Sequence, residues 1–181
     1  MSPDTSSSQP VVVPRSSHRL PCVCLFLLAA STFIAIAGLS LSCTWQEQME
    51  QTLALGINQI RADVGLPPLT NDPQLSAIAR YRAQDMAVND YFSHYPPDGC
   101  ATRCLMEREG LMPAWVGEVI AWDNGRADES ADVTISGWRD SPAHYAVITN
   151  GCFTRMGTGT VTALDGRIYD VVVFEGRAPG C

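Results

Sequence analysis

The longest apolar stretch of the chain lies close to its N-terminus. Residues 20–41 carry no formal charge, and a helix of this length would span about 33 Å, enough for the roughly 30 Å hydrocarbon layer of a membrane. Arg15 and Arg19 precede the stretch, whereas Glu47 follows it. Because positive charges stay preferentially on the cytoplasmic side, the pattern predicts that the chain beyond Cys43 lies outside the cytoplasm.

The fate of this segment, residues 20–43, stays open on the sequence. It is longer than the usual apolar core of a signal peptide, about 7–15 residues, which fits a retained membrane anchor. Ser40 and Ser42 supply small residues for cleavage by a signal peptidase, and Cys43 would suit lipidation. Each outcome exports residues 44–181, while residues 1–19, rich in Ser and Pro, are predicted to be a disordered cytoplasmic tail.

Helical periodicity marks the first half of the exported part. Apolar residues at positions 53, 57, 60 and 64 recur at helical spacing, and Gly65 ends that helix. Asp72 followed by Pro73 is typical of a helix start, and this second helix should run to about Asp90. Shorter helices are predicted over 101–109, 130–140 and 143–149.

The C-terminal part contains the predicted strands. They lie over residues 115–122, 156–161 and 168–174, and turn residues at 164–166 join the last two into a hairpin. Helices that come first in the chain, followed by strands, indicate a layered α+β domain.

The exported part holds four cysteines, which allow three disulfide pairings in an oxidising compartment. These cysteines are Cys100, Cys104, Cys152 and Cys181. The predicted hairpin pairs residue 163 with residue 167, which places Cys152 opposite position 178 and near Cys181. We therefore expect Cys152 to pair with Cys181, and Cys100 with Cys104.

Composition excludes several classes of protein. The chain has 12 basic residues, all of them arginine, against 19 acidic ones, and its net charge is −7. An acidic balance argues against nucleic-acid binding, which needs a basic patch to neutralise phosphates. Apolar residues make up 46% of the chain and charged ones 17%, so the chain as a whole is not a disordered polymer.

A series of short motifs runs through the exported part in a fixed order. They are Asn58-Gln59-Ile60-Arg61 with Gly65-Leu66-Pro67-Pro68-Leu69, the helix from Leu75 to Met86, Ser93-His94, Gly117-Glu118, Trp138 to His144, and the closing hairpin. In this order, residues 53–174 resemble the bacterial SCP-like branch of the CAP superfamily, which comprises cysteine-rich secretory proteins, antigen 5 and pathogenesis-related 1 proteins. Each motif alone is weak, but the full series is a strong signal.

The resemblance implies a fold and a site. The fold is a three-layer α-β-α sandwich with a central antiparallel sheet, preceded here by the N-terminal hydrophobic helix. The site is a surface cleft where His94, Glu118 and His144 converge, in some relatives around a divalent cation. Two neutral imidazoles and one carboxylate form a zinc-type ligand set that leaves positions open for water or substrate. Tyr95 and Tyr145, each beside a histidine, are expected to face the cleft.

Three departures from the family pattern bear on the site. Val119 stands where the family has an asparagine, and we expect this to remove a polar group that supports Glu118. Tyr145 replaces a basic residue that often follows the second histidine. The second acidic residue of many relatives has Asp140 as its nearest match. These departures weaken the expectation of a catalytic site.

The sequence therefore favours a binding function over catalysis. We expect a binding module for a small apolar ligand, a divalent cation or a partner protein, joined to the membrane through its N-terminal segment or secreted. The alternative is a metal-dependent hydrolase of the peptidase type, in which a cation held by His94 and His144 activates water. Glu118 would then act as a further ligand or as the general base.

Overall fold

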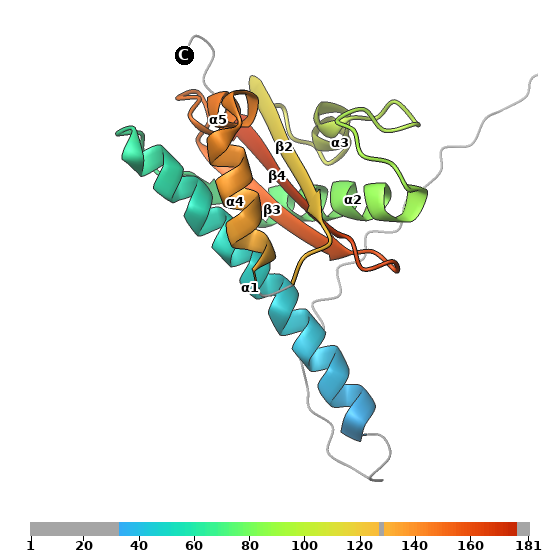
Figure 1. Cartoon of the computed structure of the whole chain (residues 1–181). Helices are drawn as coiled ribbons and strands as arrows, with labels where there is room; N and C mark the ends of the chain where they lie inside the picture. Colours follow the sequence, from blue (N-terminus) through green and yellow to red (C-terminus); the bar gives the residue numbers. More distant parts are fainter. Residues whose placement is uncertain (1–32, 127–128, 177–181) are drawn as a thin grey trace, which may run out of the picture.

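The computed structural model describes residues 33–126 and 129–176. Within these ranges the helices are α1 (Phe33–Asp63), α2 (Pro73–Asn89), α3 (Thr102–Arg108), α4 (Ser130–Asp140) and α5 (Pro142–Ile148). The strands are β1 (Thr70–Asn71), β2 (Trp115–Asp123), β3 (Arg155–Thr162) and β4 (Ile168–Gly176). Because α1, α4 and α5 cover one face of the sheet and α2 and α3 the other, the predicted α-β-α sandwich is confirmed (Figure 1).

Local sequence explains where the second helix begins and ends. α2 starts at Pro73, whose missing N–H costs nothing in the first turn. The Asp72 carboxylate caps the helix by accepting hydrogen bonds from the N–H groups of Gln74 and Leu75. The helix ends where Asp90 takes a left-handed conformation with φ of 50°. The predicted limits of this helix are confirmed.

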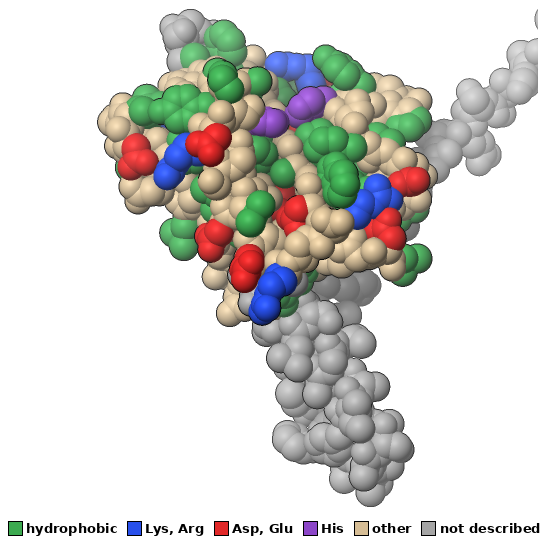
Figure 2. Space-filling model, viewed as in Figure 1, with side chains coloured by type: hydrophobic (Ala, Val, Ile, Leu, Met, Phe, Trp, Pro, Cys, Tyr) green, Lys and Arg blue, Asp and Glu red, His purple; other side chains and the backbone are tan. Residues whose placement is uncertain are grey.

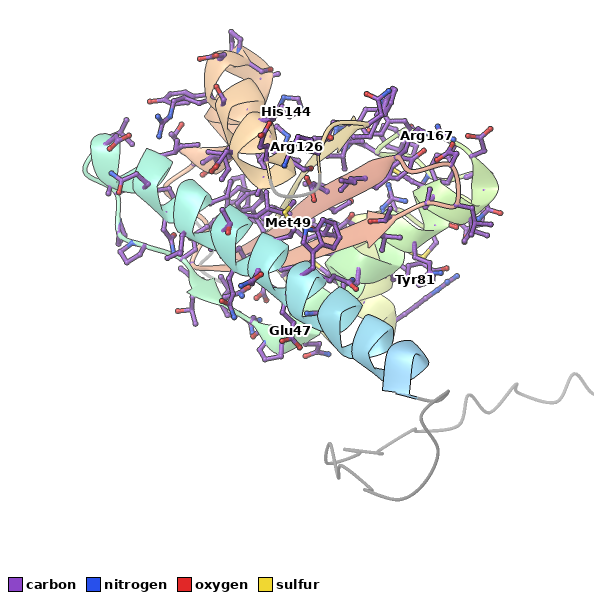
Figure 3. All side chains as sticks on the ribbon, turned by 60° about the horizontal axis from the view of Figure 1, so that its bottom comes forward. Glu47, Met49, Tyr81, Arg126, His144 and Arg167 are labelled. Atoms are coloured by element: carbon purple, nitrogen blue, oxygen red, sulfur yellow. A yellow bond between two sulfur atoms is a disulfide. The ribbon has the colours of Figure 1, made fainter. Side chains whose placement is uncertain are left out.

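The first helix is longer than the periodicity predicts. α1 begins at Phe33 and runs without interruption from the apolar stretch into the domain, ending just before the predicted stop at Gly65. Met49 points from α1 toward the sheet and is buried, whereas Glu47 points away from it (Figure 3). Residues 1–32, with the predicted tail and the first part of the hydrophobic helix, lie outside the described residues. Among the residues described, no helix is long and apolar enough to span a membrane.

The sheet has the strand order β1-β3-β4-β2. β3 and β4 form the predicted hairpin in the predicted register, which pairs Arg155 with Glu175 and Thr162 with Ile168. β2 pairs antiparallel with the other side of β4. β1 has no counterpart among the predicted strands, because two exposed polar residues carry no strand periodicity. It runs parallel to β3, so the sheet is antiparallel except at this short outer strand.

β4 divides the hydrophobic core into two layers. Val172 and Phe174 are fully buried on the face covered by α1 and α4, and Val171 and Val173 are fully buried on the face covered by α2. A strand buried on both faces appears in the sequence as an unbroken apolar run, as this segment does. Full burial of each such side chain contributes roughly 1.5–3 kcal/mol to folding.

Two glycines in β3 allow α2 to lie directly on the sheet. A Cβ atom at Gly157 would lie 2.1 Å from the backbone carbonyl carbon of Leu75, and one at Gly159 would lie 2.2 Å from the backbone nitrogen of Arg80. Both contacts are with the backbone of the helix, which cannot turn away as a flexible side chain could. This close packing fixes α2, and with it Arg82, relative to the sheet.

The outer edge of β3 is covered by side chains from both helix layers. The N–H of Thr158 donates to Ser76 Oγ of α2 at 3.3 Å. The N–H of Thr160 donates to Glu50 of α1 at 3.4 Å, and its carbonyl accepts from Gln46 at 2.6 Å. These side chains occupy donors and acceptors through which a free sheet edge pairs with other chains.

One predicted disulfide is confirmed. Cys100 and Cys104 are joined at the start of α3, with their Cα atoms 5.2 Å apart. This bond holds the first turn of the helix that carries Thr102. Cys152 is also disulfide-bonded. Cys181, its predicted partner, lies outside the described residues, so that pairing stays a prediction.

Candidate functional site

The centre of the candidate site is Glu118 on β2. Side chains alternate across a strand, and Ile120, two residues further on, is buried against the α2 layer. Glu118 points to the same face, and 7% of its side chain is exposed. Val119 points to the opposite face, where it is fully buried in the α1 layer. The expectation that Val119 removes support from Glu118 is therefore wrong, because a residue at that position faces away from the carboxylate.

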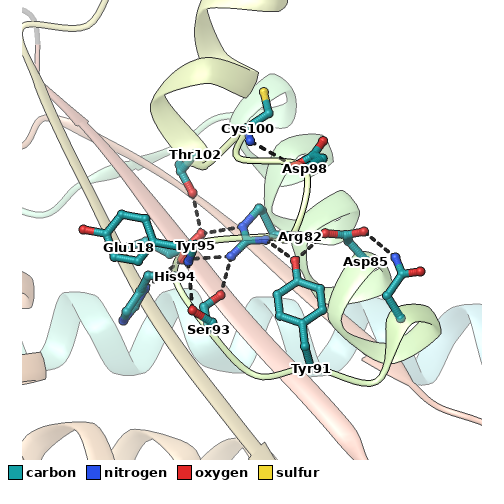
Figure 4. A network of polar contacts seen from close by, with 11 residues as sticks. Arg82, Asp85, Tyr91, Ser93, His94, Tyr95, Asp98, Cys100, Thr102 and Glu118 are labelled. Carbon is teal, nitrogen blue, oxygen red and sulfur yellow. Dashed lines mark hydrogen bonds and ion pairs between the residues drawn. The ribbon is translucent and has the colours of Figure 1, made fainter.

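Three donors from separate segments meet at the Glu118 carboxylate (Figure 4). Arg82 of α2 donates through Nε to Oε2 at 3.1 Å, and its Nη2 lies 3.5 Å from Oε1. Thr102 donates its hydroxyl to Oε2, and Nδ1 of His94 lies 2.8 Å from Oε1. Burial alone would raise the pKa of Glu118, but the bonds from His94, Arg82 and Thr102 outweigh it and lower the pKa below its ordinary value. Glu118 is therefore ionised at neutral pH, with both oxygens occupied.

The ionised carboxylate determines the tautomer of His94. Because the Glu118 carboxylate can only accept, Nδ1 of His94 must donate, which leaves Nε2 of the neutral ring with a free lone pair. The His94 side chain is 46% exposed, so the ring is open to solvent. A carboxylate that holds one nitrogen of an imidazole in this way commonly orients the other nitrogen toward a metal.

His144 comes from the opposite helix layer. It lies in α5, and its ring packs against Trp138 with ring centroids 6.5 Å apart. Its Nδ1 is buried and has no hydrogen-bond partner among the described residues. Burial, and then the repulsion that a second positive charge beside His94 would meet, lower the pKa of His144, so its ring is neutral at pH 7. The two histidines lie side by side on one face of the molecule (Figure 2).

Arg82 is the residue of the site that the sequence does not single out. Its side chain is fully buried, and besides Glu118 it donates to the Tyr91 hydroxyl and to the Ser93 carbonyl, each at 2.7 Å. Tyr91 donates in turn to Asp85. The sequence does contain one indication of its role: Arg82 lies on the apolar face of a predicted helix, and an arginine in such a place must have a buried polar partner. The sequence does not show which carboxylate that partner is.

This network fixes the loop that carries His94. The loop is bonded to Arg82 at both Tyr91 and Ser93, and the N–H of Tyr95 donates to the Ser93 hydroxyl at 3.0 Å. Burial and the hydrogen bond to Asp85 raise the pKa of Tyr91 to about 12, so this hydroxyl stays a donor at every physiological pH. The imidazole of His94 is thus held by its own bond to Glu118 and by a loop tied to the same arginine.

The three other predicted cleft residues lie in different surroundings. Tyr95 is 81% exposed next to His94, where a ligand could reach it. Tyr145 is partly buried and packs against the core between the sheet and α1. Asp140 is exposed at the end of α4 and makes no hydrogen bond or ion pair with a described residue. Within the described residues, neither side chain makes a hydrogen bond or ion pair with the network around Glu118.

The predicted zinc-type set of His94, Glu118 and His144 is not assembled as three ligands. Over residues 33–126 and 129–176, no three His, Cys, Asp or Glu side chains are placed to hold a metal ion. The physical reason is that both oxygens of Glu118 are already bonded, Oε2 to Arg82 and Thr102 and Oε1 to Nδ1 of His94. A cation at this place would have the two imidazoles as its protein ligands.

Arg61, the arginine of the first motif, has a structural position. It is fully buried and donates to the carbonyls of Pro67 at 3.1 Å, Ile148 at 2.8 Å and Asn150 at 2.9 Å. Burial lowers its pKa. These bonds tie the end of α1 to the end of α5, the helix that carries His144.

The chain is similar in sequence to known proteins. The model of the cysteine-rich secretory protein family, CAP, matches residues 56–174. The chain is 33% identical over 104 residues to the uncharacterized protein YkwD of Bacillus subtilis. It is 28% identical over 102 residues to the uncharacterized membrane protein YlbC of the same organism. The two matches cover 58% and 56% of this chain but 39% and 28% of the relatives, so the chain spans less than half the length of either.

Solved structures share the fold. An extracellular protein with an SCP domain from Bacillus anthracis has a TM-score of 0.62 and 25% identity, and the match covers 84% of this chain and 45% of that one. An outer surface protein of Borrelia burgdorferi has a TM-score of 0.64 and 19% identity, with coverage of 72% and 94%. At that identity, the second likeness shows the fold alone.

Proposed function

This chain belongs to the cysteine-rich secretory protein family, and on that premise we propose that residues 44–181 form a binding module outside the cytoplasm, which takes its ligand at the open edges of His94 and His144. The location is supported by the predicted export of the chain. It is also supported by the Bacillus anthracis relative, which is described as extracellular. Tyr95, exposed beside His94, supplies an aromatic surface next to the two rings.

The proposal depends on the occupied state of Glu118. A general base needs a carboxylate that can take up a proton near the working pH. The pKa of Glu118 is lowered instead, and both its oxygens accept hydrogen bonds. Such a group does not support the hydrolase alternative. Instead, the Glu118 carboxylate orients His94 so that Nε2 can face a ligand, which is a positioning role in a binding site.

The two imidazoles fit a divalent cation as one possible ligand. His94 is held by a carboxylate through its other nitrogen, as metal-binding histidines commonly are. His144 has a lowered pKa and a buried Nδ1 without a partner among the described residues, so its ring is neutral and able to coordinate. When bound, the cation would supply a Lewis-acidic centre with positions open to a further ligand. His94 and His144 would hold it, and Glu118 and Arg82 would keep His94 in place.

Zn²⁺ is a direct probe of this proposal, because it binds tightly at this place only if both imidazoles reach the same ion. Thermal unfolding of the purified chain with Zn²⁺ at 100 times its Kd should show a stabilisation of about 2.7 kcal/mol. The double variant His94→Ala, His144→Ala should lose the effect. Glu47→Gln, which removes an exposed carboxylate on the side of α1 turned away from the sheet, should keep it.

Two results would contradict the proposal. If Zn²⁺ does not stabilise the unmodified chain, the histidine edges do not meet at one ligand. If the stabilisation survives in the double variant, the cation binds elsewhere and the histidines are not the binding surface.

A further inference from the structure

The register of the sheet shows which backbone groups of β2 point away from it. In the β3–β4 hairpin, the N–H of Ala163 donates to the carbonyl of Arg167 at 2.8 Å, which identifies one hydrogen-bonded pair. Every second pair along the ladder is of the same kind. On β4, the residues that do not bond to β3 bond to β2 instead, and their partners on β2 are the odd-numbered residues 115–123. The N–H and C=O groups of residues 116, 118, 120 and 122 therefore point outward, away from the sheet.

Most of these outward groups are open to pairing, in the sense that they have no hydrogen-bond partner among the described residues. The carbonyl of Ile120 accepts a hydrogen bond from the indole of Trp138 at 3.2 Å, which confirms its outward direction. Val116, Glu118 and Trp122 make no outward backbone hydrogen bond with a described residue. At Val116 and Glu118 the strand thus presents two N–H and two C=O groups, with a repeat of about 6.8 Å. The edge of β3, by contrast, is covered by side chains of α1 and α2.

The open edge runs between the two histidines. β2 is the outermost strand of the sheet, between α5 and α3 (Figure 1). His94 is bonded to Glu118 on the α2 face of this strand, and His144 lies in α5 on the other face. The side chains of a strand placed beside β2 would alternate between the two faces, so some would meet His94 and Tyr95 and the others His144.

The chemistry of this edge selects one kind of ligand. An anion would use the N–H groups alone, a cation would use the carbonyl groups alone, and an alkyl chain would use neither. A peptide in extended conformation uses both, at the spacing that β2 presents. Main-chain pairing with a free sheet edge is a general mode of peptide recognition.

We infer that an extended peptide segment of another protein binds as an added strand along Val116–Glu118, framed by His94 and His144. The inference rests on the proposed function, because the same two histidines border the peptide, and it names the class of ligand. Recognition through the main chain makes the site tolerant of peptide sequence, with the alternate side chains supplying whatever selectivity there is.

Amide hydrogen exchange of the full chain, resolved by residue in NMR spectra, tests the inference. The probe is a mixture of N-acetylated, C-amidated octapeptides randomised at every position, which is suitable because main-chain recognition is tolerant of sequence. The outward amides of Val116 and Glu118 should exchange at least tenfold more slowly when the mixture is added. The amides of Gly117 and Val119, bonded to β4, should exchange slowly with and without it.

Two controls define the mechanism. A second octapeptide mixture, methylated on every other backbone nitrogen, should give no protection, because it cannot complete the ladder. Val116→Pro removes one outward N–H without touching the β4 ladder, and it should abolish the protection at Glu118. Thr162→Pro removes an outward N–H from the opposite edge of the sheet, away from the histidines, and should leave the protection unchanged.

The outcomes separate this inference from the proposed function. If Zn²⁺ binding depends on the histidines but neither outward amide is protected by peptide, the added strand is wrong and the binding module stands. If Zn²⁺ does not stabilise the unmodified chain, and the double variant His94→Ala, His144→Ala is still protected by peptide, the histidine-based proposal fails and the added strand stands. Protection of both amides that rises with protein concentration, without peptide, would overturn the inference in favour of a second copy of this chain at the same edge.

Discussion

The buried pair of Arg82 and Glu118 gives the strongest test of how the site works. Arg82 has a fully buried side chain, and Glu118 has 7% of its side chain exposed. Removing either partner leaves an uncompensated charge in a buried place, which costs about 3–5 kcal/mol of stability. Arg82→Met and Glu118→Gln should each destabilise the protein by about this amount. The double variant removes both charges of this pair, and the further ion pair of Arg82 with Asp85 is lost in both variants that lack Arg82, so it cancels in the comparison. We therefore expect a coupling energy of about 2–3 kcal/mol between the two sites.

The pH dependence of this coupling distinguishes a positioning role from catalysis. A carboxyl group whose pKa is lower in the folded state contributes stability that is present above its unfolded pKa and is lost as the pH falls through the folded value. The pKa of Glu118 is lowered, so the group is ionised at both pH 7.5 and pH 5.5. The coupling energy should be the same at the two pH values. A general base poised near neutrality would lose much of its coupling over this range.

Urea unfolding followed by tryptophan fluorescence measures the four free energies of the cycle at each pH. The matched control is the exposed pair of Arg167 and Asp90, whose side chains are 29% and 76% exposed. Arg167→Met with Asp90→Asn should give a coupling below about 1 kcal/mol, as exposed ion pairs do. A coupling for Arg82 and Glu118 no larger than this control, or one that falls at pH 5.5, would refute the description of Glu118 as a fixed, ionised positioning residue.

Three further outcomes follow from the packing. Burial raises the pKa of Asp170 to about 6, so this one group should contribute about 3 kcal/mol of added stability as the pH falls from 7.5 to below 4. In urea unfolding, the free energy of the unmodified chain should therefore improve relative to Asp170→Asn by about this amount over that range, and the same pH dependence in both proteins would contradict it. Gly157→Ala drives a methyl group into the backbone of α2 and should cost at least about 2 kcal/mol in urea unfolding, while Gly137→Ala, with nothing within 4 Å, should be neutral or stabilising. Tyr91→Phe leaves Arg82 and Asp85 each short of a partner and should cost about 1–3 kcal/mol by the same measurement; an unchanged midpoint would show that the hydroxyl contributes nothing to stability.

The parts of the fold that the sequence predicts are those set by neighbouring residues. The start of α2 depends on Asp72 and Pro73, which act within one turn of the helix. The register of the last hairpin depends on its turn, and the observed pairing of Arg155 with Glu175 follows from it. β1 is missed because its pairing with β3 is decided by the tertiary packing around it and leaves no mark on its two residues.

The parts of the site that the sequence misses depend on segments far apart in the chain. The resemblance identifies His94, Glu118 and His144 as neighbours, and the structure places the two histidines side by side with Glu118 bonded to one of them. It gives no role to Arg82, because the identity of its partner depends on how α2 lies across β2. It also misjudges Val119, since only the strand's orientation shows which face that residue occupies.

The position of β2 explains why two histidines from opposite helix layers can meet at all. His94 follows α2 and His144 lies in α5, and the sheet separates these two layers over its whole width. Side chains of both layers can therefore approach one ligand only around the margin of the sheet, and the bond of His94 to Glu118 places that ring at the margin formed by β2. The edge at β3 is closed where Glu50 and Ser76 bond to its backbone. The edge at β2 remains, so a ligand that touches both histidines must cross or follow this strand, beside the open backbone groups of Val116 and Glu118.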